Sequence, residues 1–174
     1  MPPLDALTAR AAADIKAATA ALLNGGSTAA WRTAMERALT VAHTSAYIVG
    51  TAERLGVNVK TLKGLSRAER ADIKAMAGPQ LDYLASFVSA QSGLSDAQTA
   101  ARAALYSGAV RSTYYGARFP GLPFMPGQGS ECKTSCRCEW RDNGDGTYTW
   151  KLDESEHCPT CKRRAADNPY RIEG

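Results

Sequence analysis

The first half of the chain carries apolar and small side chains every three or four residues, the spacing typical of one face of an α-helix. The pattern begins at Leu4 and stops before Asn24-Gly25-Gly26, a combination that ends helices. A second helix is expected to start after Ser27-Thr28 and to run to about Val49, before Gly50. Its apolar or small positions are Trp31, Ala34, Ala38, Ala42 and Ala46.

Two capping boxes predict where later helices begin. The two boxes are Ser66-Arg67-Ala68-Glu69 and Ser95-Asp96-Ala97-Gln98. In each, the serine hydroxyl can accept a hydrogen bond from the backbone N–H of the residue three positions later, and the side chain of that residue can reach back to the backbone N–H of the serine. The first box is expected to open a short helix to about Ala77. Pro79 can then occupy the first turn of another helix that ends at Gly93, because a missing N–H does no harm there.

The second box opens a last helix with a stripe of small residues, which predicts close pairing with a neighbouring helix. The stripe consists of Ala97, Ala101, Ala104 and Gly108. Between Gly50 and Ser66 we expect a loop or a strand around Val57-Asn58-Val59. The expected fold class is therefore mainly α, with an alanine-rich helical body over residues 1–118.

Residues 119–130 hold three prolines and three glycines, so neither a helix nor a central strand can run through them. We expect an extended linker arm that packs along the helical body through its apolar side chains, Phe119, Leu122, Phe124 and Met125. Further on, Asn143-Gly144-Asp145-Gly146 is a turn signal between β-forming segments that contain Trp140 and Trp150. This pattern predicts a β-hairpin.

Composition and charge divide the chain near residue 128. Residues 1–128 hold 13 Lys and Arg against 8 Asp and Glu, whereas residues 129–174 hold 8 against 9, together with all five cysteines. The overall charge of +4 thus belongs to the helical body and does not favour phosphate binding by the C-terminal part. Because there is neither a long apolar run nor a secretory signal, a soluble chain with reduced thiols is expected.

The cysteines have the spacing of a metal site. Cys132, Cys136 and Cys138 precede the predicted hairpin, and Cys158 and Cys161 follow it as a C-x2-C pair. Two short cysteine-containing segments of this kind, called knuckles, can supply the thiolates of a tetrahedral zinc site when they lie at one end of a hairpin. We therefore predict a zinc-binding β-hairpin module over residues 131–174, stapled by a structural zinc ion because the segment is too small for a core of its own.

Five cysteines and His157 exceed the four ligands of one zinc ion. The preferred ligands are Cys136, Cys138, Cys158 and Cys161, with Cys132 as the main competitor for a place in the first knuckle. His157 is less favoured, because adjacent residues seldom reach the same metal. Disulfides and an iron–sulfur cluster are alternatives to zinc. Four thiolates would close the coordination sphere, which disfavours a catalytic metal.

The helical body offers little other chemistry. His43 lies mid-helix with no carboxylate or cysteine nearby in sequence, and is interpreted as a structural histidine. Arg102, Arg111 and Arg118 lie on the last predicted helix and could contact nucleic acid, although a solvated face explains them as well. The chain lacks the common hydrolase and phosphate-loop motifs, so no enzyme is expected.

Several stretches together carry a likeness to a known family. In the body they are residues 81–87, 94–98 and 101–114. At the end they are residues 132–140, Trp150 and His157-Cys158-Pro159-Thr160-Cys161, with Pro126-Gly127, Gly129-Ser130 and Arg164. Through these, residues 80–170 resemble the C-terminal part of minor head proteins of tailed bacteriophages, often labelled head morphogenesis proteins. The separate N-terminal domain of longer members is not evident.

The resemblance implies a structural component of the virion that belongs to a large oligomeric assembly. Its expected partners are the major capsid protein, the portal protein or both, with packaged DNA as a further contact through Arg102, Arg111 and Arg118. Its expected location is the phage head, and the host cytoplasm during assembly. The alternative function is a zinc-ribbon DNA-binding regulatory protein, which the basic helical body supports only weakly.

Overall fold

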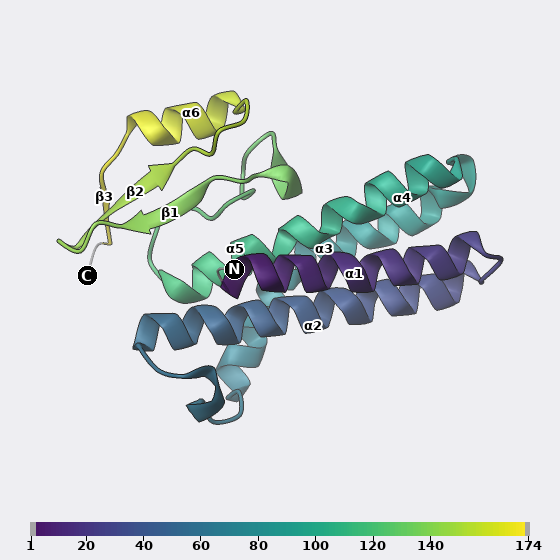
Figure 1. The fold of residues 1–174 in the computed structure, drawn as a ribbon, viewed down its shortest axis with the longest axis horizontal. Helices are drawn as coiled ribbons and strands as arrows, with labels where there is room; N and C mark the ends of the chain where they lie inside the picture. Colours follow the sequence, from purple (N-terminus) through teal and green to yellow (C-terminus); the bar gives the residue numbers. More distant parts are fainter. Residues whose placement is uncertain (1–2, 173–174) are drawn as a thin grey trace.

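The computed structural model describes residues 3–172, which form a mainly helical body joined to a small antiparallel sheet (Figure 1). Helices α1 (Pro3–Leu23) and α2 (Thr28–Leu55) lie side by side along the long axis of the molecule. Helices α3 (Arg67–Ala90), α4 (Asp96–Ala104) and α5 (Val110–Arg118) pack against this pair. The mainly α class and the end of the first helix before Asn24 are confirmed.

Helix α2 is longer than its sequence predicts. It passes through Gly50, beyond the expected end near Val49, and stops at Leu55, where Gly56 adopts a φ of 64° as its C-cap. Gly50 is needed because α2 and α5 touch there: a Cβ on Gly50 would overlap the carbonyl oxygen of Tyr114. The glycine therefore permits close helix packing and does not end the helix.

Both capping boxes are confirmed. The Oγ of Ser66 accepts from the backbone N of Glu69 at 3.2 Å, and the Oγ of Ser95 accepts from that of Gln98 at 3.3 Å. In each case the side chain of the third residue accepts in return from the serine backbone N, at 2.8 and 2.9 Å. These reciprocal bonds satisfy backbone donors at the starts of α3 and α4.

The expected break between two helices near Pro79 is wrong. Helix α3 is continuous from Arg67 to Ala90, with Pro79 in its interior. The proline removes one backbone hydrogen bond, and the residue before it is Gly78, which has no Cβ to clash with the pyrrolidine ring. A glycine before the proline thus lets the helix continue.

The last predicted helix is divided, since the 3₁₀ turn η3 (Leu105–Ala109) separates α4 from α5. The small-residue stripe does not pack as expected: Ala97, Ala101 and Ala104 are exposed. Within residues 97–110 the buried residues are Thr99, Ala103, Tyr106, Ala109 and Val110. Alanine spacing alone did not identify the buried face, because alanines occur on both sides of the helix. Between α2 and α3 the chain forms a loop with a 3₁₀ turn, η1 (Val59–Thr61), and no strand.

The predicted hairpin is confirmed. Strands β1 (Glu139–Asp142) and β2 (Thr147–Lys151) pair in antiparallel fashion, with Trp140 opposite Trp150. A third strand, β3 (Tyr170–Arg171), pairs with β2. Two residues are too few to show an alternating pattern, so this strand could not be predicted from the sequence. Helix α6 (Pro159–Ala166) connects β2 to β3.

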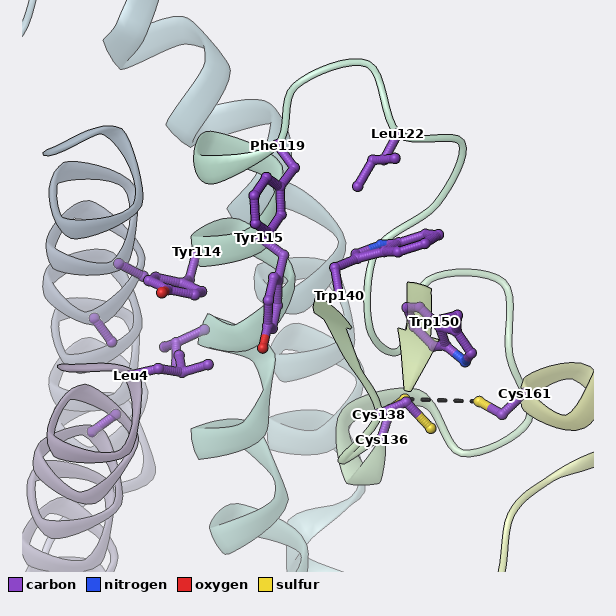
Figure 2. Close-up of a cluster of buried hydrophobic side chains, with 14 residues drawn as sticks. Leu4, Tyr114, Tyr115, Phe119, Leu122, Cys136, Cys138, Trp140, Trp150 and Cys161 are labelled. Carbon is purple, nitrogen blue, oxygen red and sulfur yellow. Dashed lines mark hydrogen bonds between the residues drawn. The ribbon is translucent and has the colours of Figure 1, made fainter. Parts of the chain in front are cut away.

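One hydrophobic cluster, called the junction core here, extends from the helices through the arm into the sheet. Figure 2 shows Tyr114 and Tyr115 of α5, the arm residues Phe119 and Leu122, and the tryptophans of the sheet. The buried members are Leu4, Ala11, Ala42, Ala46, Val110, Tyr114, Tyr115, Phe119, Leu122, Cys136, Cys138, Trp140, Trp150 and Cys161. The arm packs as its apolar residues predict, and the Phe124 carbonyl accepts from Trp140 Nε1 at 2.8 Å. Domain boundaries after residues 118 and 130 stay a prediction.

His43 lies inside the helical body. It is 1% exposed, and its Nδ1 lies 2.7 Å from the Oγ1 of Thr113 on α5. Among the described residues its Nε2 has no hydrogen-bond partner. Burial lowers the pKa of His43 to about 4, because the charged imidazolium would lose its hydration. These surroundings support a structural role for this histidine.

Replacing Gly50 by Ala should destabilise the protein by about 1–3 kcal/mol, because the added methyl group would push α2 away from the backbone of α5. Urea denaturation of both proteins measures the difference. Gly116→Ala is the matched control on α5, because a Cβ there would meet the flexible end of Met76 at 3.3 Å, and its effect should be smaller. Equal effects of the two substitutions would contradict the close contact at Gly50.

His43 should make stability depend on pH. The folded protein keeps this residue neutral, while the unfolded chain binds a proton near pH 6.5. Its contribution is therefore complete above pH 6.5 and is lost as the pH falls towards 4, by about 3 kcal/mol. Urea denaturation between pH 7 and 4 should show this extra loss in the natural protein relative to His43→Gln. Parallel pH profiles of the two proteins would contradict the assignment.

Candidate metal centre

The hairpin and α6 bring the cysteines to one place. Cys132 and Cys136 flank the 3₁₀ turn η4 (Lys133–Ser135), and Cys138 directly precedes β1. Cys158 is the N-cap residue of α6, and Cys161 lies in its first turn. Because β1 and β2 pair along their length, the segments before and after the hairpin meet at the same end of the sheet. The sequence spacing predicts this meeting.

Four thiols form a connected chain of short contacts. The Sγ of Cys161 lies 3.7 Å from that of Cys132 and 3.9 Å from that of Cys136, and the Sγ of Cys158 lies 3.6 Å from that of Cys132. Four sulfurs bound to zinc at about 2.3 Å lie about 3.8 Å from one another in a tetrahedron. The observed separations therefore suit a metal ion, and Cys132, Cys136 and Cys161 all lie within 4.8 Å of one another.

The fifth thiol has a different neighbour. The Sγ of Cys138 lies 3.6 Å from Nδ1 of His157. On the other side of the ring, Nε2 of His157 lies 2.9 Å from the carbonyl oxygen of Asp153 and 3.2 Å from its carboxylate. A histidine fixed in this way by a carboxylate and a carbonyl has the surroundings that are usual for a metal ligand. Of the expected ligands, the structure thus gathers Cys132, Cys136 and Cys161 within 4.8 Å of one another, while Cys138 lies beside His157.

Burial and mutual contact alter the acidity of these thiols. Cys136, Cys138 and Cys161 are at most 4% exposed, while Cys132 and Cys158 are half-buried. A hydrogen bond with Cys138 lowers the pKa of Cys136 to about 5, whereas burial, followed by the neighbouring thiols, raises that of Cys161. Cys136 is thus readily ionised, while the raised pKa values of Cys132, Cys138 and Cys161 favour their protonated forms. A bound cation would favour ionisation of all of them.

Several buried hydrogen-bond donors belong to the same region of the molecule as the thiols. Arg111 donates through Nη2 to the carbonyl oxygens of Arg137 and Cys138, at 3.1 and 3.4 Å. Arg164 of α6 lies over the ring of Phe124, 3.8 Å from its centre. Among the described residues, Arg111 Nε, Arg164 Nη1 and Trp150 Nε1 are buried donors without an acceptor. An environment with surplus donors suits an anionic centre such as metal-bound thiolates.

The chemistry of the donors limits what the site can do. All five cysteines are free thiols, with closest sulfur separations of 3.6–3.9 Å that are far from the roughly 2.0 Å of a disulfide bond. Cys138, His157 and Asp153 resemble a nucleophile, base and carboxylate, but Cys138 is 1% exposed and a substrate could not reach it. The cysteines could hold a metal ion in a structural role, and their positions are better suited to this than to covalent catalysis.

The arginines suggested for nucleic-acid contact do not form one free patch. Arg118 forms an ion pair with Glu53 at 2.9 Å and donates to the Tyr114 hydroxyl. Arg111 holds the carbonyls beside the thiols, and Arg102 lies over the ring of Phe87. Each guanidinium therefore has a partner within the chain. DNA contact through them stays a prediction.

A groove of about 1110 Å³ lies beside the metal centre, between α3, η3 and the arm. Two of its lining side chains, Tyr83 and Leu105, are large, apolar and half or more exposed. Lys133 lies on its rim with its ammonium group 5.8 Å from the centre of the Tyr83 ring. The sequence did not reveal this groove, because its walls come from three separate segments.

The chain was compared with known protein families, with curated proteins and with solved structures, and none of the comparisons found a match. In the described residues 3–172, no helix combines the length and the apolar character needed to cross a membrane.

Proposed function

We propose that this chain is a structural assembly protein of a tailed-phage head, without enzymatic activity, that binds the major capsid protein, the portal protein or both. The observation that carries the proposal is the position of the thiols, since Cys136, Cys138 and Cys161 belong to the junction core. A metal bound there would fasten the arm, the sheet and α6 to the helices at once. This region lies within residues 80–170, which resemble phage minor head proteins.

Zinc is the metal that the site suits best. The donors are thiols and an imidazole, which zinc binds in closed tetrahedral structural sites. A C-terminal module with two tryptophans, two tyrosines and little aliphatic surface gains much of its stability from such an ion. The role we assign to the zinc is thus to complete folding of a small module.

The groove beside the arm is the surface we propose for a head protein. Its exposed Tyr83 and Leu105 offer apolar area to a neighbour, and the adjoining arm presents further prolines. Surfaces of this kind on one subunit are commonly covered by another in an assembly. The location that follows is the phage head, reached through the host cytoplasm during assembly.

The runner-up is a zinc-ribbon regulator that binds DNA. It requires exposed cations that can neutralise phosphates. Arg111 and Arg118 are instead bound to groups within the chain, and the C-terminal part has no excess of positive charge. These observations favour the assembly protein.

Removing the metal should unfold the C-terminal module and leave most of the helical signal intact. The helices keep a second cluster around Trp31, Leu39 and Phe87 that does not involve the thiols. Treatment with a zinc chelator, or Cys158→Ser together with Cys161→Ser, should therefore abolish near-ultraviolet circular dichroism from Trp140 and Trp150 and change far-ultraviolet helical signal little. Ser135→Ala, at an exposed position of the same segment, is the matched control.

Two outcomes of that experiment would count against the proposal. Loss of all helicity would mean that the junction core is required by the whole body and not only by the module. An unchanged near-ultraviolet signal after complete removal of metal would show that the ion has no structural role.

Purified head particles should contain the chain even after washing at high salt, because apolar contacts in the groove resist salt. Mass spectrometry of the particles detects it, and Tyr83→Ser with Leu105→Ser should lower its copy number. Ser86→Ala on the same wall is the control. Absence from particles, combined with DNA affinity that falls steeply with salt, would favour the DNA-binding alternative.

A further inference from the structure

One face of α3 lines the groove beside the metal centre. The residues that it contributes recur every three or four positions and include Asp72, Met76, Pro79, Tyr83 and Phe87. The fifteen residues from Asp72 to Phe87 extend about 22 Å along the helix axis. A segment of another protein that lies along this face in extended form would therefore span it with about seven residues.

The walls of the groove are largely apolar. Tyr83 of α3 is 55% exposed, and Leu105 of η3 is 50% exposed. The arm forms part of the lining and contributes Pro120, Pro123 and Pro126, which have no backbone N–H to offer a ligand. A hollow with exposed apolar side chains and few polar groups is typical of a binding site whose ligand supplies apolar side chains of its own.

Two cations lie towards the C-terminal part of α3, each over an aromatic ring. The ammonium group of Lys133 is 5.8 Å from the centre of the Tyr83 ring, and the guanidinium carbon of Arg102 is 5.2 Å from that of Phe87. Both cations are exposed, and neither forms an ion pair with a carboxylate of the described residues 3–172. The other charged lining residue, Asp72, lies towards the N-terminal end of α3.

The backbone of Lys133 is held in an unusual conformation. Its φ of 45° lies in the left-handed region, which is unfavourable for a residue with a side chain. Its N–H donates to the carbonyl of Ser130 at 3.2 Å, and its carbonyl accepts from the backbone N of Cys136 at 3.1 Å. A Cβ on Gly127 of the arm would overlap this same carbonyl. Such a conformation persists where neighbouring contacts fix it, so the Lys133 side chain starts from a defined position beside the groove.

We propose that the groove binds a short segment of a partner protein in which apolar side chains are followed by acidic ones. The apolar side chains pack against Tyr83 and Leu105, and the carboxylates pair with Lys133 and Arg102. A basic side chain at the other end of the segment meets Asp72. This inference rests on the groove proposed above as the surface for a head protein, and it adds the chemistry of the segment that is bound.

The charges of the groove favour an acidic peptide over a nucleic acid. A nucleic-acid strand carries one phosphate per nucleotide and is bound by cations along its whole path. Among the described lining residues the cations are Lys133 and Arg102, both towards one end, and Asp72 towards the other end would repel a phosphate. A peptide can place its carboxylates at one end and apolar side chains along the rest, which matches this distribution.

The test uses the full chain and labelled peptides of about seven residues, with leucine and phenylalanine in the middle, two glutamates at one end and a lysine at the other, made in both directions. Fluorescence anisotropy at low salt should show that one of them binds about three- to tenfold more tightly than its version with glutamine in place of glutamate, because two exposed ion pairs contribute. Lys133→Gln should reduce this difference, and adding Arg102→Gln should remove it.

Two further variants separate charge from apolar contact. Tyr83→Ser with Leu105→Ser should weaken the binding of the glutamate and glutamine peptides alike, because both use the apolar wall. Lys74→Gln is the matched control, since Lys74 is an exposed cation of α3 that does not line the groove, and it should leave the difference unchanged.

Each contrary result has a definite meaning. Failure of both glutamate peptides to bind, or equal affinity for the glutamine versions, would overturn the inference, and these measurements need no variant. Equal effects of Lys133→Gln and Lys74→Gln would also overturn it. Tighter binding of a poly-dT oligonucleotide would show that the groove takes nucleic acid. Dimers in sedimentation experiments that are abolished by Tyr83→Ser with Leu105→Ser would show that a second copy occupies it. The content of purified head particles decides the proposed function separately, whichever of these results is obtained.

Discussion

The packing of aromatic rings across the junction core is the interaction on which the arm, the sheet and the cysteine cluster depend. Trp140 and Trp150 lie with ring centres 5.1 Å apart, and Phe124 of the arm contacts both of them. On the other side, Phe119 lies between Tyr115 of α5 and Tyr148 of the sheet. Without these contacts, the hairpin would have no hydrophobic surface against which to fold, and the thiols would not be held in position.

The core and the sulfur cluster depend on each other. The rings fix the hairpin on α5, which keeps the knuckle before β1 close to α6. A metal ion bound to the cysteines would in turn join the segment before β1 to α6. Arg111 connects the two systems, because it belongs to α5 and its guanidinium donates to the carbonyl oxygens of Arg137 and Cys138. Stability and metal binding are therefore expected to change together when either system is altered.

Much of the fold could be predicted from local signals. Serine capping boxes, the Asn-Gly turn and the Pro/Gly arm each report on a few neighbouring residues, and all of them occur in the structure. The errors concern contacts between distant residues. Gly50 ends no helix because it faces Tyr114, and the alanine stripe from Ala97 is exposed because Thr99 and Ala103 face the core. At the metal centre, spacing identified the cysteines, but the partnership of Cys138 with His157 depends on the direction of side chains. The i, i+4 spacing of Asp153 and His157 was the one available signal.

Leu4 at the start of α1 and Ile172 after β3 both contact the junction core. Residues far apart in the chain thus complete the same cluster. The second cluster, around Trp31 and Leu84, needs nothing beyond Tyr106. The helices can therefore fold while the chain is still being synthesised, whereas the metal centre gains its full surroundings only after residue 172 has left the ribosome. A metal ion held by the cysteines would therefore be acquired late in the maturation of this protein.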